Sequence, residues 1–429
     1  MSWMVLSSGL LVLLSSGALL GAALGLVGLI LLHFQGGEST SLAINSIWNL
    51  LTGFSLTAVP LFIFLGDILL SSGVSTRVYN GLAPLFRRIP GQLLHTNIAV
   101  CTLFSAVSGS SSATAAAIGS IGFPELKRRG YSPSMVVGTL AAGGTLGLLI
   151  PPSLALIIYG ATQNVSIGKL FLAGILPGLM ISGAFFAWIF IRSLVGSPVV
   201  PEGKEPFDWA EVRQGLKQIW PLPILIFFVL GTIYMGIATP TEAASLGVVA
   251  SIVLGFTWGD LTLGKLWGAF KNATIMFSAI AFIMVGTAIL SQAVSMLAMP
   301  REAVTAISSF GLGPYGILLM IVVVYIVLGC FFDGISLLLM TLPITFPMMM
   351  SLGFDPIWFG IIVTLLMEIG MITPPVGLNL FVLVSITKNE VSLTEAAWAS
   401  LPYWLILLSA VGLYTLSPSL VLWLPGFMG

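Results

Sequence analysis

Two short motifs contain residue types that could bind ions inside a membrane. They are Gly147-Leu148-Leu149-Ile150-Pro151-Pro152 and Gly370-Met371-Ile372-Thr373-Pro374-Pro375. Proline lacks a backbone N–H and disfavours the α conformation at the residue before it, so two consecutive prolines are expected to unwind a helix. Unwinding frees backbone carbonyl groups, and carbonyl oxygens at a helix C-terminal end are suitable ligands for sodium.

Two apolar runs, at about 92–126 and 314–350, predict helical hairpins that enter and leave on the same face. Each is interrupted near its centre, by Ser108-Gly109-Ser110-Ser111-Ser112 in the first and by Phe332-Asp333-Gly334 in the second. Such tips cannot face lipid and must be buried in protein or line a wet cavity. Each hairpin precedes one Pro-Pro motif, so we expect one tip and one break to form a cation cage in each half.

The same interruptions expose helix N-termini, whose free amides and positive dipole ends attract anions. Hydroxyl and amide side chains at these points are the candidate substrate contacts: Ser110, Ser111, Ser112, Thr114, Ser153 and Asn379. Small residues also permit close helix packing. For residues 106–117 the two explanations are compatible.

Ionisable residues within membrane segments are functional candidates by default. Asp333 at the second tip could bind or sense a cation, although it could also merely cap the returning helix. Glu368 precedes the second break by two residues, and Asp67 lies far from either break. Glu242 is interpreted as a helix N-cap partner, and neither His33 nor His95 is assigned a chemical role.

The composition places these motifs in an integral membrane protein. Of 429 residues, 57% are hydrophobic and only 7% are charged, against about 25% charged in a soluble domain. The zero net charge argues against a nucleic-acid partner. Cys101 and Cys330 lie far apart in apolar segments, which excludes a disulfide framework.

The apolar runs predict where the chain crosses the membrane. The first apolar stretch is interpreted as a retained span. Full crossings are predicted at 9–33, 51–74, 133–163, 170–195, 219–237, 241–257, 273–297, 356–387 and 396–422.

Basic residues predict the orientation. Most of them fall in connections on one predicted side, which the positive-inside rule makes the cytoplasm. The N-terminus is then cytoplasmic and the C-terminus periplasmic, and the polar segment Val199–Gln218 is a cytoplasmic connector along the surface. The residues concerned are Arg77, Arg87, Arg88, Lys127, Arg128, Arg129, Arg192, Lys204, Arg213, Lys217, Lys265, Lys271 and Lys388.

The chain repeats itself at one fixed separation. Six pairs are each 223 positions apart: Pro124 and Pro347, Gly130 and Gly353, Pro133 and Pro356, Gly147 and Gly370, Pro151 and Pro374, and Pro152 and Pro375. The predicted units are 45–195 and 268–422, with a connector and linking helices at 196–267, in a single transmembrane transporter unit. The basic run 127–129 has the uncharged counterpart 350–352, which indicates that the second unit is inverted. The predicted fold class is therefore an all-α polytopic membrane protein with two inverted-topology repeats, re-entrant hairpins and broken helices.

Three segments complete a resemblance to a known family. They are Ser105 through Thr114, Gly144 through Ser153, and Gly353 through Asn379. The third segment ends with Ile372-Thr373-Pro374-Pro375-Val376-Gly377-Leu378-Asn379. The sequence resembles, over nearly its whole length, the large membrane subunit of tripartite ATP-independent periplasmic (TRAP) transporters. The resemblance implies an elevator-type sodium symporter of the bacterial inner membrane, with a scaffold domain and a transport domain. It also implies a small membrane subunit of about four spans and a soluble periplasmic binding protein as partners.

The resemblance also implies two sodium sites and no organic cofactor. The first would use Ser108, Ser110, Gly147, Ile150 and Pro152, and the second Phe332, Gly334, Gly370, Thr373 and Pro375, with Asp333 beside them. The second tip departs from a copy of the first, because its glycine lies at an offset of 225 and an aspartate replaces the serine run. The family moves carboxylates, including dicarboxylates and sialic acids, as well as sulfonates and zwitterions, and this sequence does not select among them.

Other functional classes of membrane protein account for fewer features of the sequence. A channel would account for the membrane content but not for the paired breaks. A membrane-embedded hydrolase would need a base or metal partner for its serines, and two isolated histidines do not supply one. The main alternative is a stand-alone dicarboxylate–sodium symporter with similar inverted hairpins.

Overall fold

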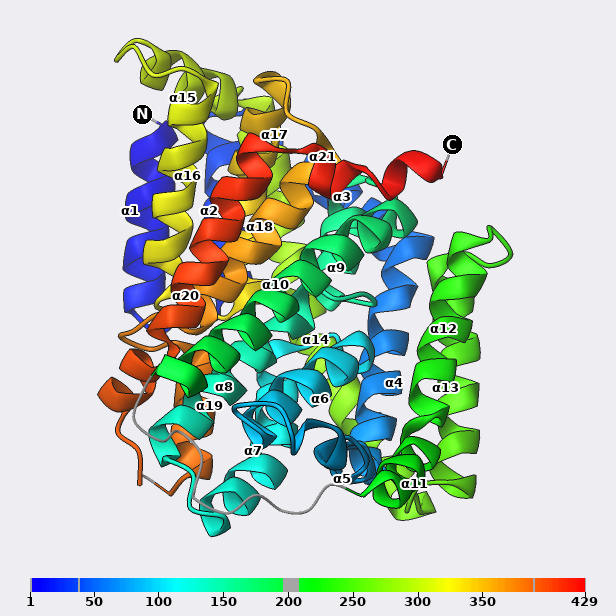
Figure 1. The fold of residues 1–429 in the computed structure, drawn as a ribbon. Helices are drawn as coiled ribbons and strands as arrows, with labels where there is room; N and C mark the ends of the chain where they lie inside the picture. The colour runs from blue at the N-terminus through cyan, green and yellow to red at the C-terminus, as the bar shows by residue number, and fades with distance from the viewer. Residues whose placement is uncertain (1, 38, 196–207, 389, 429) are drawn as a thin grey trace.

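The computed structural model describes residues 2–37, 39–195, 208–388 and 390–428. Within these residues the chain is built of helices, with no strand (Figure 1). This confirms the predicted all-α class. The connector residues 196–207, which include Lys204, lie outside the described part.

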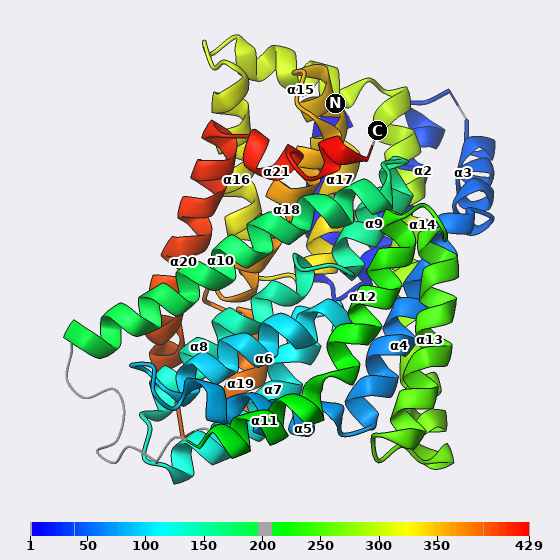
Figure 2. The ribbon, with the colours of Figure 1, turned by 45° about the vertical axis from the view of Figure 1, so that its right-hand side comes forward.

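The first 34 residues form two helices, α1 (Ser2–Ser15) and α2 (Leu20–Phe34). A Cβ atom on Gly9 would lie 3.0 Å from Val27, which shows that the two helices pack antiparallel around the turn at Gly17 (φ 81°). The single crossing predicted at 9–33 is therefore wrong. Because the chain reverses here, both termini lie at the same end of the molecule (Figures 1 and 2), and not at opposite ends as predicted.

The segment that follows contains the first predicted repeat. Its core elements are three helical pieces at 41–71, a further helix, a hairpin, a broken helix and a long helix. In order they are α3 (Ser41–Leu51), η1 (Phe54–Thr57), α4 (Ala58–Ser71), α5 (Val74–Phe86), α6 (Leu93–Ser108), α7 (Ser111–Arg128), α8 (Pro133–Thr145), η2 (Leu146–Leu148), α9 (Leu154–Gln163) and α10 (Ile167–Val195).

Three linking helices follow the first repeat: α11 (Trp209–Ile219), α12 (Pro221–Tyr234) and α13 (Pro240–Thr257). Helix α11 is amphipathic and packs against α5. It meets α12 at an angle of 42°. Glu242 forms a capping box with Thr239 at the start of α13, as predicted.

The second repeat contains a similar series of elements, in which one 34-residue helix takes the place of α3, η1 and α4. These are α14 (Leu263–Met296), α15 (Met299–Ser308), α16 (Pro314–Gly329), α17 (Gly334–Ser351), α18 (Pro356–Met371), α19 (Leu378–Ile386) and α20 (Leu393–Leu416), followed by α21 (Ser419–Leu422) and η3 (Pro425–Phe427). Corresponding hairpin arms have equal lengths, with 16 residues in α6 and α16 and 18 residues in α7 and α17.

Local backbone features match between the repeats. Gly130 and Gly353, which follow α7 and α17, have φ values of 82° and 81°, a left-handed conformation that favours glycine. Both Pro-Pro peptide bonds are cis. The connection after α7 lies at the lower end in Figures 1 and 2, whereas the connection after α17 lies at the upper end. The hairpins therefore open toward opposite ends, as an inverted repeat requires.

Within the described residues, six helices are long and apolar enough to cross a membrane, or seven with the bent pair of α11 and α12. Five of them correspond to predicted crossings, namely α4 with η1, α10, α13, α14 and α20. The sixth, α17, is a hairpin arm. The crossings predicted at 133–163 and 356–387 each consist of two shorter helices separated at the Pro-Pro motif.

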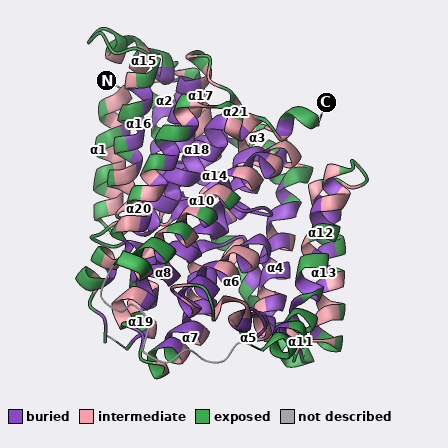
Figure 3. Cartoon of the chain, viewed as in Figure 1, coloured by how far each residue is buried: buried purple, intermediate pink, exposed green. Residues whose placement is uncertain are grey.

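The two broken helices form the centre of the protein. Every residue of α18 from Trp358 to Met371 is buried, and so is every residue of α8 from Val136 to Thr145. Figure 3 shows the buried surface concentrated on these inner helices, while α1, α13 and α16 carry exposed faces. A helix that is apolar and buried all round is surrounded by protein, so the breaks lie inside the molecule.

Ion pairs concentrate at the end of the molecule that carries α5, α7 and α11 (Figure 1). Burial tends to raise the pKa of Glu125, but hydrogen bonds and charges from Arg129 and Arg128 outweigh it and hold that pKa below its usual value. This end contains most of the basic residues that predicted the cytoplasmic side. Ion pairs among the described residues also include Arg77–Asp260, Arg87–Glu211 and Lys127–Glu390.

Candidate ion and substrate site

The first hairpin tip lies directly against the first break. The backbone N–H of Leu154 donates to the carbonyl of Gly109 over 3.3 Å. A Cβ atom on Gly147 would lie 2.8 Å from the carbonyl oxygen of Ser110, and one on Gly109 would lie 3.3 Å from the carbonyl oxygen of Pro152. The structure thus brings together Ser110, Gly147 and Pro152, which sequence analysis placed in one cage.

Hydroxyl groups fill the space under this tip. The Thr114 hydroxyl donates to the Ser110 carbonyl over 2.8 Å and lies 2.5 Å from the Ser108 hydroxyl. Ser110 caps α7 by accepting a hydrogen bond from the N–H of Ala113. Ser108, Ser110 and Thr114 are all buried, so their oxygens form a compact polar group within the apolar interior.

The second tip and break repeat the first arrangement. The N–H of Val376, directly after the second Pro-Pro motif, donates to the carbonyl of Cys330 over 3.3 Å, so the second tip is also bonded to its break. Gly329 and Gly370 bring α16 and α18 into contact, because a Cβ on either would lie 2.7 Å from the other's Cα. Only glycine permits this approach.

Two side chains of the second cage have defined local roles. Asp333 caps α17, with Oδ2 accepting a hydrogen bond of 3.1 Å from the N–H of Ser336. The structure thus establishes the capping role that sequence analysis kept as the alternative to cation binding. Thr373 donates to the Ile369 carbonyl over 2.5 Å and accepts a hydrogen bond from the Trp404 indole over 2.9 Å.

The two cages meet across the repeats. A Cβ on Gly334, at the second tip, would lie 3.2 Å from the Leu148 side chain in the first break. The Asn379 side-chain amide donates to the Ser111 hydroxyl over 2.6 Å, and both residues are buried. Asn379 Oδ1 has no hydrogen-bond partner among the described residues. Two candidate substrate residues from opposite repeats therefore lie side by side at the start of α7.

Other candidates lie apart from this pair. Ser153 is fully buried, and its hydroxyl donates to the Leu148 carbonyl and caps α9. Ser112 is partly exposed on α7. Phe332 lines an apolar cavity, and Pro375 lines a second cavity beside the break. The backbone contacts between tips and breaks thus agree with the predicted cages more closely than the positions of the predicted side chains do.

Sequence analysis missed two contacts with the cages. Gly66 of α4 packs on the first tip, because its Cβ would lie 3.1 Å from the Cα of Ser108. Asp67 follows this glycine in the sequence, and its predicted distance from the breaks stays a prediction. The Trp404 contact with Thr373 was also missed. Neither contact has a signal in sequence spacing, because each depends on how separate helices pack.

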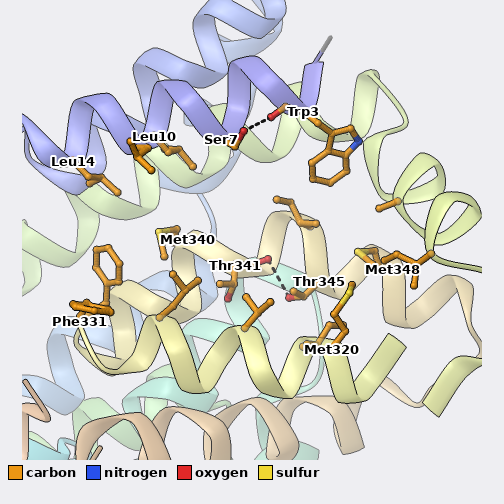
Figure 4. Close-up of a pocket in the computed structure, with 18 of the residues that line it drawn as sticks. Trp3, Ser7, Leu10, Leu14, Met320, Phe331, Met340, Thr341, Thr345 and Met348 are labelled. Atoms are coloured by element: carbon orange, nitrogen blue, oxygen red, sulfur yellow. Dashed lines mark hydrogen bonds between the residues drawn. The ribbon is translucent and has the colours of Figure 1, made fainter. Parts of the chain in front are cut away.

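The larger cavity, of about 1180 Å³, lies between α1, α15, α16 and α17 (Figure 4). Figure 4 shows Leu10, Leu14, Met340 and Phe331 pointing into it, with few polar groups such as Thr341 and Thr345. This lining does not suit an ion. The second cavity, of about 560 Å³, is bounded by the Pro374-Pro375 break and the first part of α20.

The described residues at the two breaks offer oxygen atoms and not the side chains that transition metals prefer. Among the described residues, no group of three or more His, Cys, Asp or Glu side chains could hold a metal ion. A transition metal would need such ligands. The first tip instead gathers the hydroxyl groups of Ser108 and Thr114 and the carbonyl of Ser110, and oxygen atoms of these kinds are ligands for hard cations.

Comparison with known proteins agrees with this architecture. Residues 8–420 match the model of the family described as "Tripartite ATP-independent periplasmic transporter, DctM component". The C4-dicarboxylate TRAP transporter large permease protein DctM of Pseudomonas aeruginosa is 35% identical over 410 residues, covering 95% of this chain and 94% of that protein. The ectoine/5-hydroxyectoine TRAP transporter large permease protein UehC of Ruegeria pomeroyi is 35% identical and covers 86% of each chain.

A solved structure shares the fold. The Alcanivorax borkumensis YdaH transporter, described as having an unusual topology, aligns with a TM-score of 0.62 and 17% identity, covering 92% of this chain and 90% of that chain. At this identity the likeness concerns the fold alone. The family match extends over almost the whole chain, including both hairpins and both breaks. The chain therefore belongs to the DctM component family of tripartite ATP-independent periplasmic transporters.

Proposed function

We propose that this chain is a sodium-coupled permease that takes up a small organic anion, a carboxylate or sulfonate, across the bacterial inner membrane. The observation that carries the proposal is that each repeat has one hydrogen bond between its hairpin tip and its break, Leu154 to Gly109 and Val376 to Cys330. Each bond holds a Pro-Pro break beside a hairpin tip. Paired sites of this kind at a repeat interface are typical of ion-coupled transporters.

At least two sodium ions are proposed to bind. Ser108, Ser110, Gly147, Ile150 and Pro152 would hold the first. The second would be held by Phe332, Gly334, Gly370, Thr373 and Pro375, with Asp333 supplying a negative charge from the tip. Oδ2 of Asp333 is used by the helix cap, which leaves Oδ1 to face a cation. A bound cation would neutralise local carbonyl dipoles and favour closure of the tip on the break.

The proposed substrate site lies between the two cages. The N-terminus of α7 offers free amides to an anion, and Ser111 and Asn379 offer a hydroxyl and an amide beside it. Ser110, Ser112, Thr114 and Ser153 remain the outer candidates. The similarity to permeases named for C4-dicarboxylates and for ectoine supports a small polar solute.

The transport cycle is proposed to be an elevator motion, in which the hairpins and broken helices move together against a scaffold. Substrate would be delivered by a periplasmic binding protein, and a small membrane subunit of about four spans would complete the permease. The end that carries α5, α7 and α11 would face the cytoplasm, because it holds most of the basic residues. Both termini would then lie on the periplasmic side.

Uptake into vesicles tests the coupling. The chain is reconstituted with its binding protein and small subunit, and uptake of labelled succinate, isethionate and ectoine is measured. At least one solute should accumulate under an inward sodium gradient. Equal uptake with potassium replacing sodium at fixed pH would defeat sodium coupling. Uptake by the chain alone would favour the stand-alone symporter.

A glycine pair tests the first cage directly. Gly147→Ala places a methyl group 2.8 Å from the Ser110 carbonyl, whereas Gly183→Ala meets nothing within 4 Å. Gly147→Ala should therefore abolish or strongly weaken stabilisation of the purified protein by sodium chloride. Gly183→Ala should leave it intact. Equal sodium responses in the two variants would remove the first cage from the proposal.

A further inference from the structure

Glu368 is a buried acid that neither cage includes. It lies on α18 with none of its surface exposed, and neither carboxylate oxygen has a hydrogen-bond partner among the described residues. An unpaired charge in such a place is expensive. The carboxylate therefore needs a positive charge nearby, or it must be neutral.

The side chain of Glu368 points across the repeat boundary. Helix α18 contacts η2 at the first break, and there the backbone amide of Leu149 lies close to the carboxylate without forming a hydrogen bond to it. Leu149 lies in the first break, between Gly147 and Ile150. The same segment is pressed from the other side by Gly174 of α10, whose Cβ would lie 2.5 Å from the Leu149 carbonyl oxygen.

No basic side chain is available to pair with Glu368. Within the described residues, the helices that pack against α18 are α8, α9, α10, α16, α17, α19, α20 and α21 with η2. Their sequences contain two basic residues, Lys169 and Arg192, which lie in the first and last turns of the 29-residue helix α10. In the described part of the chain, Glu368 is thus a buried carboxyl group without a positively charged side chain beside it.

We infer that Glu368 supplies the negative charge that holds a cation at the first break, so that the second repeat completes the first cation site. The inference rests on the proposed sodium coupling and adds a residue and a charge to it. Glu368 acts as a positioning residue, because it attracts the cation toward the freed carbonyls of the break.

The residue of the first repeat that is equivalent to Glu368 indicates that the two repeats carry different numbers of buried acidic side chains. The position of α8 equivalent to Glu368 is Thr145, whose hydroxyl donates to the Ala142 carbonyl. Helix α8 therefore carries no carboxylate toward the second break. The second cage has Asp333 at its own tip, whereas the first tip has only serines. Each proposed cation thus has one carboxylate, and both carboxylates come from the second repeat.

The test uses purified protein and thermal unfolding in sodium chloride, with choline chloride maintaining the ionic strength. Wild type should be stabilised by sodium, and Glu368→Gln should need at least a tenfold higher sodium concentration for the same shift. In choline alone, Glu368→Gln should unfold at the same temperature as wild type or higher, because an unpaired buried charge has been removed. Glu368→Met repeats the test if the glutamine variant cannot be purified.

Control variants separate the possible outcomes. Glu302→Gln removes an exposed acid on α15 and should leave the sodium response unchanged. Glu368→Asp keeps the charge and should keep a sodium response within about threefold of wild type. A sodium response in wild type that is unchanged in Glu368→Gln would overturn this inference alone. Absence of any sodium response in wild type would instead defeat the proposed sodium coupling.

Discussion

The side-chain amide of Asn379 lies 2.6 Å from the Ser111 hydroxyl oxygen, and this bond joins the two repeats where α7 and α19 begin. The repeat counterpart of Asn379 is Leu156. Asn379→Leu should therefore be accommodated by the fold while it removes the amide. We expect the KM for the transported solute to rise at least tenfold. The measurement is uptake against solute concentration in reconstituted vesicles.

The Asn379→Leu substitution should weaken substrate binding without weakening cation binding. The sodium concentration for half-maximal stabilisation of the purified Asn379→Leu protein should stay within about twofold of wild type. Ser120→Ala, on the exposed side of α7, is the matched control and should change neither quantity. An unchanged KM would place the substrate elsewhere.

The opposite directions of the two hairpins predict opposite labelling. Arg128 at the end of α7 and Ser351 at the end of α17 are both exposed. In a background without Cys101 and Cys330, Arg128→Cys should react with a membrane-impermeant thiol reagent from the cytoplasm only. Ser351→Cys should react from the periplasm only. Reaction of both from one side would contradict the inverted arrangement.

Asp333 should show two separable effects. Asp333→Asn keeps the cap on α17, because asparagine caps about as well as aspartate. If the charge also serves the second cation, the sodium concentration for half-maximal transport should rise several-fold while stability changes little. Asp333→Ala should additionally lower the free energy of unfolding by about 1 kcal/mol. Normal sodium dependence of Asp333→Asn would leave Asp333 with its capping role alone.

Glu125 should make a small part of the stability acid-sensitive. Its pKa is lowered in the folded protein despite partial burial, because Arg129 and Arg128 bind its carboxylate. The stabilisation is therefore present above the pKa of the unfolded chain and is lost as the pH falls through the lower, folded-state pKa. Removing the pairs in Glu125→Gln should cost about 0.5–1 kcal/mol at neutral pH. The difference in unfolding temperature from wild type should shrink as the medium becomes more acidic than the usual glutamate pKa.

Several elements were predictable because proline and glycine act locally. The breaks follow from the two Pro-Pro motifs, and the hairpin tips follow from polar residues inside long apolar runs. The α1–α2 hairpin was missed because its apolar residues run on with only Ser15-Ser16-Gly17 to mark the turn. Contacts such as those of Gly66 with Ser108 and of Trp404 with Thr373 depend on helix packing, which has no signature in sequence spacing.

The mutual burial of the two broken helices has a consequence for biosynthesis. The first break gains its inner covering from α18, which the ribosome makes more than 200 residues later. Until then the freed carbonyls of the nascent first half would face lipid, which backbone polar groups do not tolerate. The insertion machinery must therefore retain or shield the first half until α18 and α19 emerge. Truncation after residue 355 should consequently produce a chain that is degraded, even though its own hairpin and broken helix are complete.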